Sequence, residues 1–547
     1  MTARNRSRNR VTPGSAPPRS SKLPWRLLIA IVLPILGVIW LIQGAYSIHH
    51  FALPQRTIVI DSAGCRMPTT VFEPAGRSPF HEGSVVIFHG LSANRRIMFY
   101  LGENLAIGGR RVFIPDLPGH GDNTDTFSFA RVDECAAAAL ESLIHNHQID
   151  PNTTILVGHS MGGAIAISMA DLEPVAGTIA ISPGPLIMPK RMPSNLLVFV
   201  AQFDIPAVKR EAESIAAAAG LNRTSPNDFA QDRAFDLITL PHALHTSGLY
   251  SPTVIGQSID WIRQTLASRP NTDATDHSAD LSLLGEAMDA PARALTGSLS
   301  GLLGILVLFF PCIVIAGKIS APAFDESSGS AAFVFPSRAL AIAEMAVCAL
   351  AGVFLLKLGV PLRFLHIYSG SYLSSIFLIV GILLLALNRT AAKQSWQPVA
   401  RHLIPAAILA FATFLALGGW LNWQLTDLWM NSARWLRFAE LLPAIFVFTF
   451  AEETVLGPVQ EGRQRALRYM VFLLLRSEIW LACLLAFYEL NSGEFLILLL
   501  AVFFALFSLL QRLATDALRR RTGSAVAAAL FSAILLAWFT AAVFPLS

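Results

Sequence analysis

Nine long apolar stretches, with one region of mixed composition between the first two, limit what this chain can fold into. The first stretch covers residues 27–48, and the other eight lie at about 298–317, 338–356, 370–387, 403–420, 441–457, 469–489, 495–511 and 524–544. A helix needs ~20 apolar residues to cross a bilayer. Because lipid offers the backbone no hydrogen-bond partner, spanning segments must be helices or closed barrels. We therefore expect a multi-pass membrane protein whose residues 297–547 form an all-α transmembrane domain of about eight spans.

The first apolar stretch follows a strongly basic segment. Residues 1–26 contain seven basic side chains and no acidic one, separated by Pro, Ser and Asn. This composition predicts a disordered basic tail. Residues 27–48 are then either a secretory signal peptide or an uncleaved transmembrane anchor. Their length exceeds that of a usual secretory apolar core, and Ala45-Tyr46-Ser47 is a loose match to a cleavage site, which favours the anchor.

The basic residues predict how the spans are oriented, because short cytoplasmic loops are enriched in Lys and Arg. If the N-terminal tail is cytoplasmic, the loops that share its side contain Arg389, Lys393, Arg401, Arg463, Arg465, Arg468, Arg512, Arg519, Arg520 and Arg521. The opposite loops are poorer in basic residues. The loop between the spans 403–420 and 441–457 is one of these, and four tryptophans typical of a membrane interface lie around it: Trp420, Trp423, Trp429 and Trp435. We therefore expect a cytoplasmic N-terminus and a region 55–270 outside the cytoplasm, in the periplasm if the cell is bacterial.

Net charge, metal-ligand spacing and cysteine content indicate which partners, cofactors and disulfides to expect. The formal net charge of +4 reflects the arginines that flank the spans, so it indicates contact with membrane lipids rather than nucleic acid. No metal-ligand spacing occurs, and we expect neither a metal nor a cofactor. Cys65 and Cys135 both lie in the external region, where they either form one disulfide or remain two free thiols.

Residues 55–270 show alternating strand and helix signals. Strands are predicted near 56–61, 68–73, 84–89, 111–115, 153–158, 176–181, 196–201 and 235–240, with helices between the later ones. This alternation is typical of a mostly parallel sheet covered by helices on both faces. The next segment begins with many Asp, Ser, Ala and Pro residues, and we interpret residues 271–296 as a linker.

The fifth predicted strand is followed directly by Gly158-His159-Ser160-Met161-Gly162 and then by a run of small residues that predicts a helix. A serine between two glycines at such a turn is typical of a nucleophile elbow, because the turn is too tight for side chains on the flanking positions. The alternative is an ordinary Ser-Gly turn between a strand and a helix. The surrounding strand and helix favour a nucleophilic Ser160.

Two further segments carry a family resemblance. The first is Val85-Val86-Ile87-Phe88-His89-Gly90-Leu91, which resembles the third strand and oxyanion loop of the α/β-hydrolase superfamily. The second is Asp116-Leu117-Pro118-Gly119-His120-Gly121, which resembles the loop after the fourth strand of that superfamily. Residues 55–270 therefore resemble a serine esterase or lipase of that superfamily, fused here to a multi-span membrane region. The resemblance implies an eight-stranded, mostly parallel sheet and a triad in the chain order Ser, acid, His.

Candidates for the acid and the base follow from that order. A serine hydroxyl needs a base to accept its proton, and a carboxylate must orient the base. Asp204 follows the apolar strand 196–201, although it could instead cap the helix that begins at Pro206. Weaker alternatives are Asp228, Asp232 and Asp236. Both His242 and His245 follow the last predicted strand; we favour His245, which leads into the last helix, and leave His242 as the alternative.

The resemblance also implies an oxyanion hole from the backbone amides of Leu91 and Met161. We assign no catalytic role to the motif histidines His89, His120 and His159. The segment from Ser182 to Asn195 is a short, proline-rich loop where lidded lipases carry an insertion, which indicates an open cleft. Its apolar residues either line an acyl pocket or simply pack, and they are Leu186, Ile187, Met188 and Met192.

Ionisable residues inside the predicted spans are candidates for function or for polar contacts between helices. They include Glu344, Glu452, Glu453, Arg476 and Glu478. Arg476 and Glu478 are two residues apart and so point to different sides of a helix, and we expect each to find a partner on a neighbouring span.

The leading hypothesis is a membrane-anchored serine hydrolase that cleaves an ester or related acyl bond of a small-molecule or lipid substrate outside the cytoplasm. Two alternatives remain. One is an acyltransferase with the same triad, and the other is a transporter or scaffold whose hydrolase-like domain does not turn over a ligand.

Overall fold

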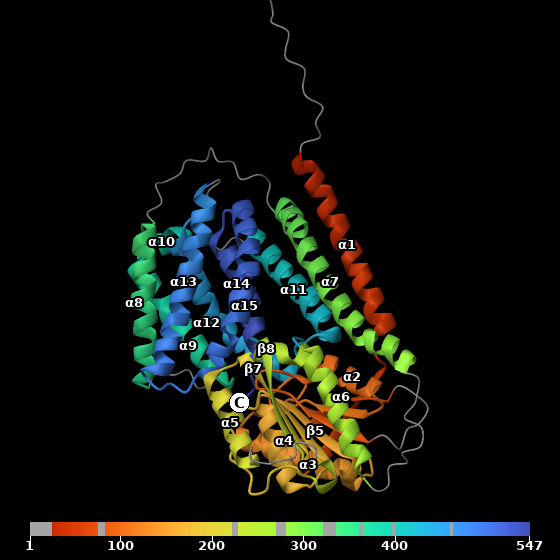
Figure 1. Ribbon diagram of the computed structural model, residues 1–547. Coiled ribbons are helices and arrows are strands. Elements are labelled where there is room, and N and C mark those ends of the chain that lie inside the picture. The colour runs from red at the N-terminus through yellow and green to blue at the C-terminus, as the bar shows by residue number, and fades with distance from the viewer. Residues whose placement is uncertain are drawn as a thin grey trace, which may run out of the picture.

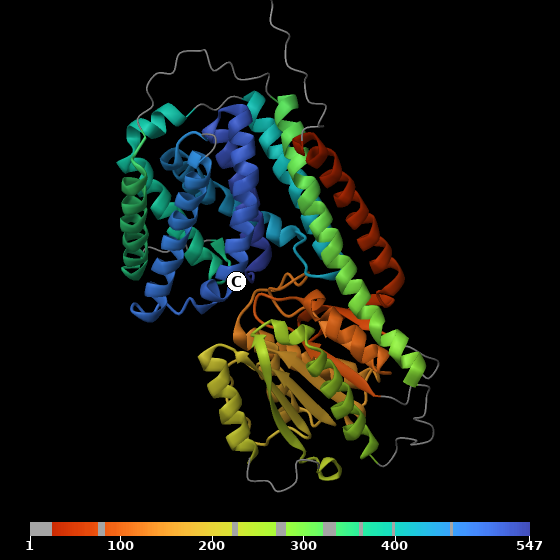
Figure 2. The same cartoon turned by 45° about the horizontal axis from the view of Figure 1, so that its top comes forward.

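The computed structural model describes residues 25–74, 83–220, 228–269, 281–320, 335–359, 365–396, 400–459 and 463–547. Most of the predicted basic tail, residues 1–24, and residues 271–280 of the predicted linker lie outside these ranges. The sheet domain sits at one end of a set of long helices (Figure 1 and Figure 2).

One eight-stranded sheet organises the sheet domain, in the order β1-β2-β4-β3-β5-β6-β7-β8. Its strands are β1 (Gln55–Ser62), β2 (Cys65–Phe72), β3 (Ser84–Phe88), β4 (Arg111–Pro115), β5 (Thr154–His159), β6 (Gly177–Ile181), β7 (Leu196–Phe203) and β8 (Phe235–Leu244). β2 pairs antiparallel with both β1 and β4, whereas the strands from β4 to β8 pair in parallel. The predicted fold class is therefore confirmed.

Helices cover both faces of this sheet. They are α2 (Phe99–Ile107), α3 (Phe129–His145), α4 (Met161–Leu172), α5 (Pro206–Ala219) and α6 (Pro252–Ala267). Side chains alternate between the two faces along a strand. In β3, Val85 and Ile87 pack with α2 and α6, whereas Val86 and Phe88 pack with α3 and α4 on the other face. This double coverage explains why the central strands are apolar along their whole length.

The other helices are mostly long and apolar: α1 (Trp25–Phe51), α7 (Leu281–Ser320), α8 (Arg338–Lys357), α9 (Gly370–Leu387), α10 (Arg389–Ser395), α11 (Ala400–Gln424), α12 (Ser432–Leu456), α13 (Arg463–Tyr488), α14 (Phe495–Thr522) and α15 (Ala525–Val543). Among the described residues, eight helices are long and apolar enough to cross a membrane. The helix α12 is not one of the eight, although it has 25 residues and packs against α9 and α15. It carries five charged residues, Arg434, Arg437, Glu440, Glu452 and Glu453, so we retain the predicted span 441–457 as a prediction.

α1 and α7 form an antiparallel pair through glycines. A Cβ atom on Gly44 of α1 would lie 2.5 Å from the carbonyl oxygen of Gly297 on α7, and one on Gly304 would lie 2.6 Å from the carbonyl oxygen of Gly37. Small residues thus let the two backbones approach closely. The predicted linker is wrong over 281–296, because α7 begins at Leu281. The Leu, Glu, Ala and Met residues of that stretch are strong helix formers.

Several ionisable residues of the predicted spans have partners on other helices. Arg476 of α13 binds the Glu452 carboxylate of α12 with two hydrogen bonds of 2.6 and 2.9 Å. Asn388 Nδ2 donates to Glu344 Oε2 of α8 over 2.7 Å. The expected partner is therefore found for Arg476. Glu478 Oε2, in contrast, has no hydrogen-bond partner among the described residues.

Glu453 of α12 is the centre of a buried ion-pair network. Its carboxylate pairs with Arg468 of α13 at 3.1 Å and with Arg512 and Arg519 of α14. Arg468 and Arg512 also pair with Asp516 of α14. A charge buried without a partner is costly, so this network fixes how α12, α13 and α14 are aligned.

The sheet domain contacts the helices through the carboxyl ends of β3 and β4. Leu546, which follows α15, donates its backbone N–H to the Gly119 carbonyl over 3.0 Å and accepts a hydrogen bond from Phe127 N–H. Asn94 exchanges hydrogen bonds with the loop between α11 and α12, where its Oδ1 accepts from Asp427 N–H over 3.1 Å. The carboxyl edge of the sheet therefore faces the ends of the long helices.

Candidate active site

The backbone at Ser160 is held in a conformation that few residues adopt. Its φ is 56° and its ψ is −120°, directly between β5 and α4. A Cβ atom on Gly158 would lie 1.9 Å from the Gly162 carbonyl oxygen, and one on Gly162 would lie 2.1 Å from the Phe88 carbonyl oxygen. Both flanking positions thus admit only glycine. This is the geometry of a nucleophile elbow, which lifts the serine hydroxyl out of the sheet.

Three predicted residues form one hydrogen-bonded chain. Ser160 Oγ lies 3.0 Å from His245 Nε2, and His245 Nδ1 lies 2.7 Å from Asp204 Oδ1. Ser160 follows β5, Asp204 follows β7 and His245 follows β8, so parallel strands bring all three to the carboxyl edge of the sheet. A histidine oriented by a carboxylate in this way can accept the proton of the serine hydroxyl.

Asp204 is held as a carboxylate by four neighbouring donors. Ser182 Oγ donates to Oδ2 over 2.5 Å and the Ala201 N–H donates to the same oxygen, while the Ile205 N–H and His245 bind Oδ1. Burial by itself would raise the pKa of Asp204, but these donors outweigh it and hold the pKa below its ordinary value. Ser182 was not predicted as a site residue, because only the pairing of β6 with β7 brings it to the acid.

The alternative acids and the alternative base lie elsewhere. Asp228, Asp232 and Asp236 precede or begin β8, whereas His245 follows its other end. A strand of that length separates the two ends by about 30 Å. His242 is exposed on β8, while His245 is buried beside Asp204. The geometry therefore favours Asp204 and His245 over the alternatives.

The two segments predicted to supply the oxyanion hole meet at Ser160. A Cβ atom on Gly90 would lie 3.1 Å from Ser160 Cβ, so the loop that carries Leu91 packs against the elbow. Met161 is the first residue of α4, and N–H groups of a first helical turn have no partner within the helix. His89 Nδ1 donates to the Gly90 carbonyl over 2.9 Å and its Nε2 accepts from Leu117 N–H over 3.0 Å, which fixes this loop.

His159 supports the base through its backbone. Its Nε2 lies 3.0 Å from the carbonyl oxygen of His245 and must donate, because a carbonyl oxygen only accepts. Burial, followed by the nearby His245, lowers the pKa of His159 to about 3, so the ring stays neutral. We assign His159 a positioning role rather than a catalytic one.

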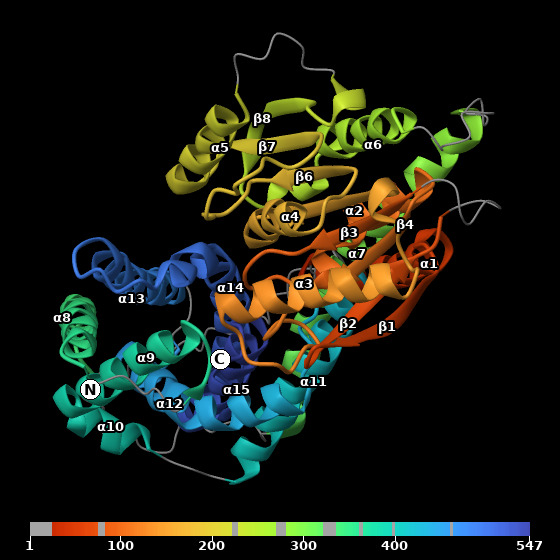
Figure 3. The ribbon, with the colours of Figure 1, turned by 90° about the horizontal axis from the view of Figure 1, so that it is seen from below.

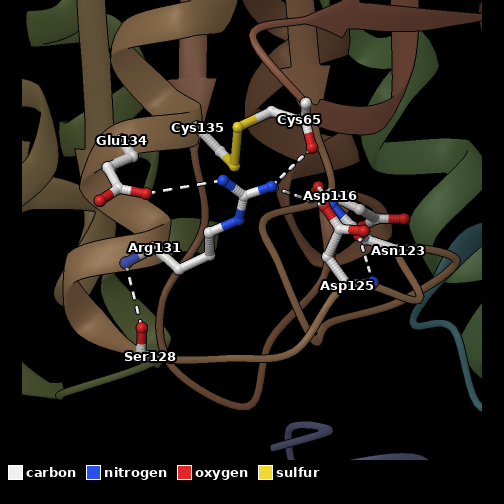
Figure 4. The surroundings of a disulfide bond; sticks show 9 residues. Cys65, Asp116, Asn123, Asp125, Ser128, Arg131, Glu134 and Cys135 are labelled. Atoms are coloured by element: carbon white, nitrogen blue, oxygen red, sulfur yellow. Dashed lines mark hydrogen bonds and ion pairs between the residues drawn. A yellow bond between two sulfur atoms is a disulfide. The ribbon is translucent and has the colours of Figure 1, made fainter.

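Cys65 and Cys135 form a disulfide, which settles the alternative that the sequence leaves open. It joins the first residue of β2 to α3 and closes a segment with a sequence separation of 70 residues (Figure 4). Arg131 of α3 lies beside it and donates to the Gly64 carbonyl over 2.6 Å. Disulfides persist in oxidising compartments and are rare in the cytosol.

Among the described residues, one acidic cluster has the spacing of metal ligands. Oxygen atoms of Asp116, Asp122 and Asp427 lie within 4.8 Å of one another, at the junction between the sheet domain and the helices. The Arg95 guanidinium already pairs with Asp116 and with Asp122, at 2.6 Å for the latter. Because this arginine supplies the positive charge, the cluster is better described as an ion-paired junction.

Comparisons with known proteins give one family match and one partial relative. Residues 85–266 match the alpha/beta hydrolase family. The chain is 34% identical over 90 residues to the dihydrolipoyllysine-residue acetyltransferase component of the acetoin cleaving system of Pseudomonas putida; the match spans 16% of this chain and 23% of that relative.

Similar solved structures cover less than half of the chain. They include a predicted CIB-like hydrolase from Thermoplasma acidophilum (18% identity, 39% of this chain, 99% of that one, TM-score 0.32) and an esterase from Pyrobaculum calidifontis (15%, 44%, 94%, 0.32). A third is an alpha-beta serine hydrolase homologue from Coxiella burnetii (15%, 38%, 96%, 0.30). With the family match at 85–266 and the fold described above, the chain contains a domain of the alpha/beta hydrolase family, joined to a C-terminal set of long apolar helices.

Proposed function

We propose that this chain is a membrane-anchored serine hydrolase that cleaves an ester or related acyl bond outside the cytoplasm. The observation that carries the proposal is the hydrogen-bonded chain from Ser160 Oγ through His245 to Asp204, with distances of 3.0 and 2.7 Å. A domain that only binds a ligand has no need of a strained serine aligned with a buried imidazole and carboxylate.

The reaction follows from this arrangement. Ser160 Oγ attacks the acyl carbon while His245 Nε2 takes the hydroxyl proton, and Asp204 stabilises the imidazolium that forms. The N–H groups of Leu91 and Met161 bind the oxyanion. His245 then returns its proton to the leaving alcohol, which leaves an acyl group on Ser160. Water deprotonated by His245 attacks that acyl group, and the carboxylic acid departs with Ser160 restored.

Three observations support an extracytoplasmic location. The helix α10, which carries Arg389 and Lys393, lies at the ends of the long helices away from the hydrolase domain (Figure 1), as the positive-inside rule requires. Trp423, Trp429 and Trp435 are partly exposed near the helix ends on the domain side, the level at which interfacial aromatics sit. The disulfide between Cys65 and Cys135 needs an oxidising compartment.

A fluorophosphonate probe tests the chemistry, because it reacts covalently with an activated serine. We expect the full-length protein in nanodiscs to be labelled at Ser160, and Ser160→Ala to lose the label. His245→Ala slows labelling strongly, whereas His242→Ala, on the same strand but exposed, labels at the parent rate. Folded parent protein that resists the probe would contradict the proposed function.

A membrane-impermeant version of the same probe tests the location. Spheroplasts that express the chain should be labelled at Ser160 without lysis. Labelling that appears only after lysis would place the domain in the cytoplasm and would leave the proposed chemistry intact.

A further inference from the structure

The strands β7 and β8 extend beyond the rest of the sheet. Pairing between β6 and β7 ends at Ile181 and Phe199, yet β7 continues to Phe203, where it pairs with Leu244 of β8. At ~3.3 Å per residue, the two strands project about 13 Å past the end of β6. Asp204 and His245 follow directly at the tip of this projection.

Large apolar side chains are exposed at this tip and in the loop that begins at Ser182. Phe203 and Leu244 are 58% and 60% exposed, and each immediately precedes a residue of the proposed triad. Ile187 is 94% exposed, and it lies in the loop that begins at Ser182 and passes Ser160, where the Gly184 N–H binds the Ser160 carbonyl over 2.9 Å. We call Ile187, Phe203 and Leu244 the apolar rim.

The apolar rim lies on the edge of the sheet that faces the ends of the long helices. The carboxyl ends of β3 and β4 contact those ends through Asn94 and Gly119, and the parallel strands β7 and β8 end on the same edge. In a view from below, β7, β8 and α5 lie outside the outline of the long helices (Figure 3). At the helix ends, the partly exposed Trp423 and Trp429 mark the level of a membrane interface. A bilayer around the apolar helices would therefore face the rim.

We propose that the apolar rim inserts into the adjacent leaflet and that the substrate is an acyl ester resident in that leaflet, which reaches Ser160 without crossing water. The proposal rests on the hydrolase function above. Exposed apolar clusters bordered by polar residues mark surfaces that contact a membrane or another protein. The polar border is present here: Gln202 and His242 are exposed beside Phe203, and Lys209 Nζ donates to the Gln202 carbonyl.

Spin-label depth measurements test insertion without any need for activity. Nitroxides are attached in Ile187→Cys, Phe203→Cys and Leu244→Cys, with the full chain in nanodiscs of phosphatidylcholine and phosphatidylglycerol. The matched control is Leu172→Cys, 63% exposed at the end of α4 and on the opposite edge. The parent chain, treated in the same way, gives the background of its own thiols. We expect the rim labels to be more accessible to oxygen than to a water-soluble nickel chelate, and the control to show the reverse.

A second measurement tests the substrate class. The readout is the ratio of turnover on a long-chain ester embedded in the nanodisc to turnover on a short soluble ester. Burying apolar side chains in lipid is favourable, so Ile187→Ser and Phe203→Ser/Leu244→Ser should each lower this ratio about tenfold or more. Leu172→Ser should leave it at the parent value.

The outcomes separate the two proposals. Rim labels that are as accessible to water as the label at Leu172, or an unchanged ratio in both rim variants, would overturn insertion of the rim. Failure of the parent chain to react with fluorophosphonate would overturn the hydrolase function, while the spin-label depths would still decide whether the rim lies in lipid.

Discussion

Ser182 Oγ donates a hydrogen bond of 2.5 Å to Asp204 Oδ2, on the carboxylate oxygen that His245 does not use. Burial raises the pKa of Asp204. The contact with His245, followed by the hydrogen bond from Ser182, outweighs burial and lowers the pKa below its ordinary value. Ser182→Ala should therefore raise the pKa of Asp204, and the more basic carboxylate should stabilise the imidazolium of His245 more strongly, which moves the acid limb of the kcat/KM profile to higher pH. A hydrogen bond to a charged group contributes about 1.5–3 kcal/mol, so kcat should fall about tenfold or more.

The measurement for Ser182→Ala is a pH profile with a soluble ester. The control is Ser214→Ala, at an exposed position of α5 where the hydroxyl donates to the Arg210 carbonyl. If the acid limb of the Ser182→Ala profile coincides with that of the parent chain, the hydroxyl does not support the charge on Asp204.

Asp204→Asn should lower kcat by about 10⁴-fold, because an amide neither fixes the tautomer of His245 nor stabilises its charged form. Fluorophosphonate labelling and ester turnover both report this loss. Asp228→Asn and Asp236→Asn serve as controls, since both residues lie at the other end of β8 and should keep activity within about twofold of the parent value. A larger loss in either control would reopen the choice of acid.

Local patterns were sufficient to predict the sheet and the chain of Ser160, Asp204 and His245. The elbow glycines have a steric cause that acts within five residues, and the triad residues each follow a strand whose apolar run is visible in the sequence. Parallel pairing then places the ends of these strands on one edge without further information. The shared role of these three side chains remains a prediction until the labelling experiment is done.

Contacts between distant segments were not predicted, because no local pattern encodes them. Ser182 reaches Asp204 only through strand pairing, and Arg434 reaches Gly119 across 315 residues. The start of α7 at Leu281 was missed because Asp, Ser and Pro nearby indicated a linker, whereas the Leu, Glu, Ala and Met residues of the stretch favour a helix. The pairing of Cys65 with Cys135 likewise depends on a distance that spacing does not give.

Glu103 of α2 lies at the junction with the helices, and we expect it to make the free energy of unfolding depend on pH. Its Oε1 accepts hydrogen bonds from Gln424 Nε2 over 2.7 Å and from Leu53 N–H over 3.3 Å. Burial raises the pKa of Glu103 from 4.5 to about 7, against the effect of these donors. Between pH 4.5 and about pH 7, Glu103 of the folded chain holds a proton that Glu103 of the unfolded chain has released. Stability should therefore fall as pH rises through this window.

Glu103→Gln keeps both acceptor contacts and removes the ionisable group. The variant should match the parent chain below pH 4.5, the ordinary pKa of the group, and exceed its stability above pH 7 by up to about 3 kcal/mol. Thermal unfolding midpoints in nanodiscs at both pH values measure this difference. Glu141→Gln, at an exposed position of α3, is the matched control. Equal midpoints for Glu103→Gln and the parent chain at pH 8 would show that Glu103 is not held protonated.

Arg434 of α12 forms hydrogen bonds with both the hydrolase domain and the C-terminal end of the helices. Its Nη1 donates to the carbonyls of Ala541, Ala542 and Phe544, at 2.6, 2.9 and 3.2 Å, while Nη2 donates to the Gly119 carbonyl over 3.1 Å. The side chain is 2% exposed. Arg434→Met would leave these buried carbonyls without a donor, and each such loss costs about 1–3 kcal/mol. We expect destabilisation of at least about 3 kcal/mol.

Arg434→Lys should also destabilise this junction, because a single ammonium group cannot reach all the carbonyl oxygens that the guanidinium binds. Limited proteolysis in nanodiscs then releases the hydrolase domain from both Arg434→Met and Arg434→Lys at a temperature at which the parent chain resists. The matched control is Arg437→Met on the same helix, whose ion pair with Glu440 is partly exposed and worth at most about 1 kcal/mol. Parent-like resistance in Arg434→Met would mean that the contacts of Leu546 and Asn94 hold the two parts together without the arginine.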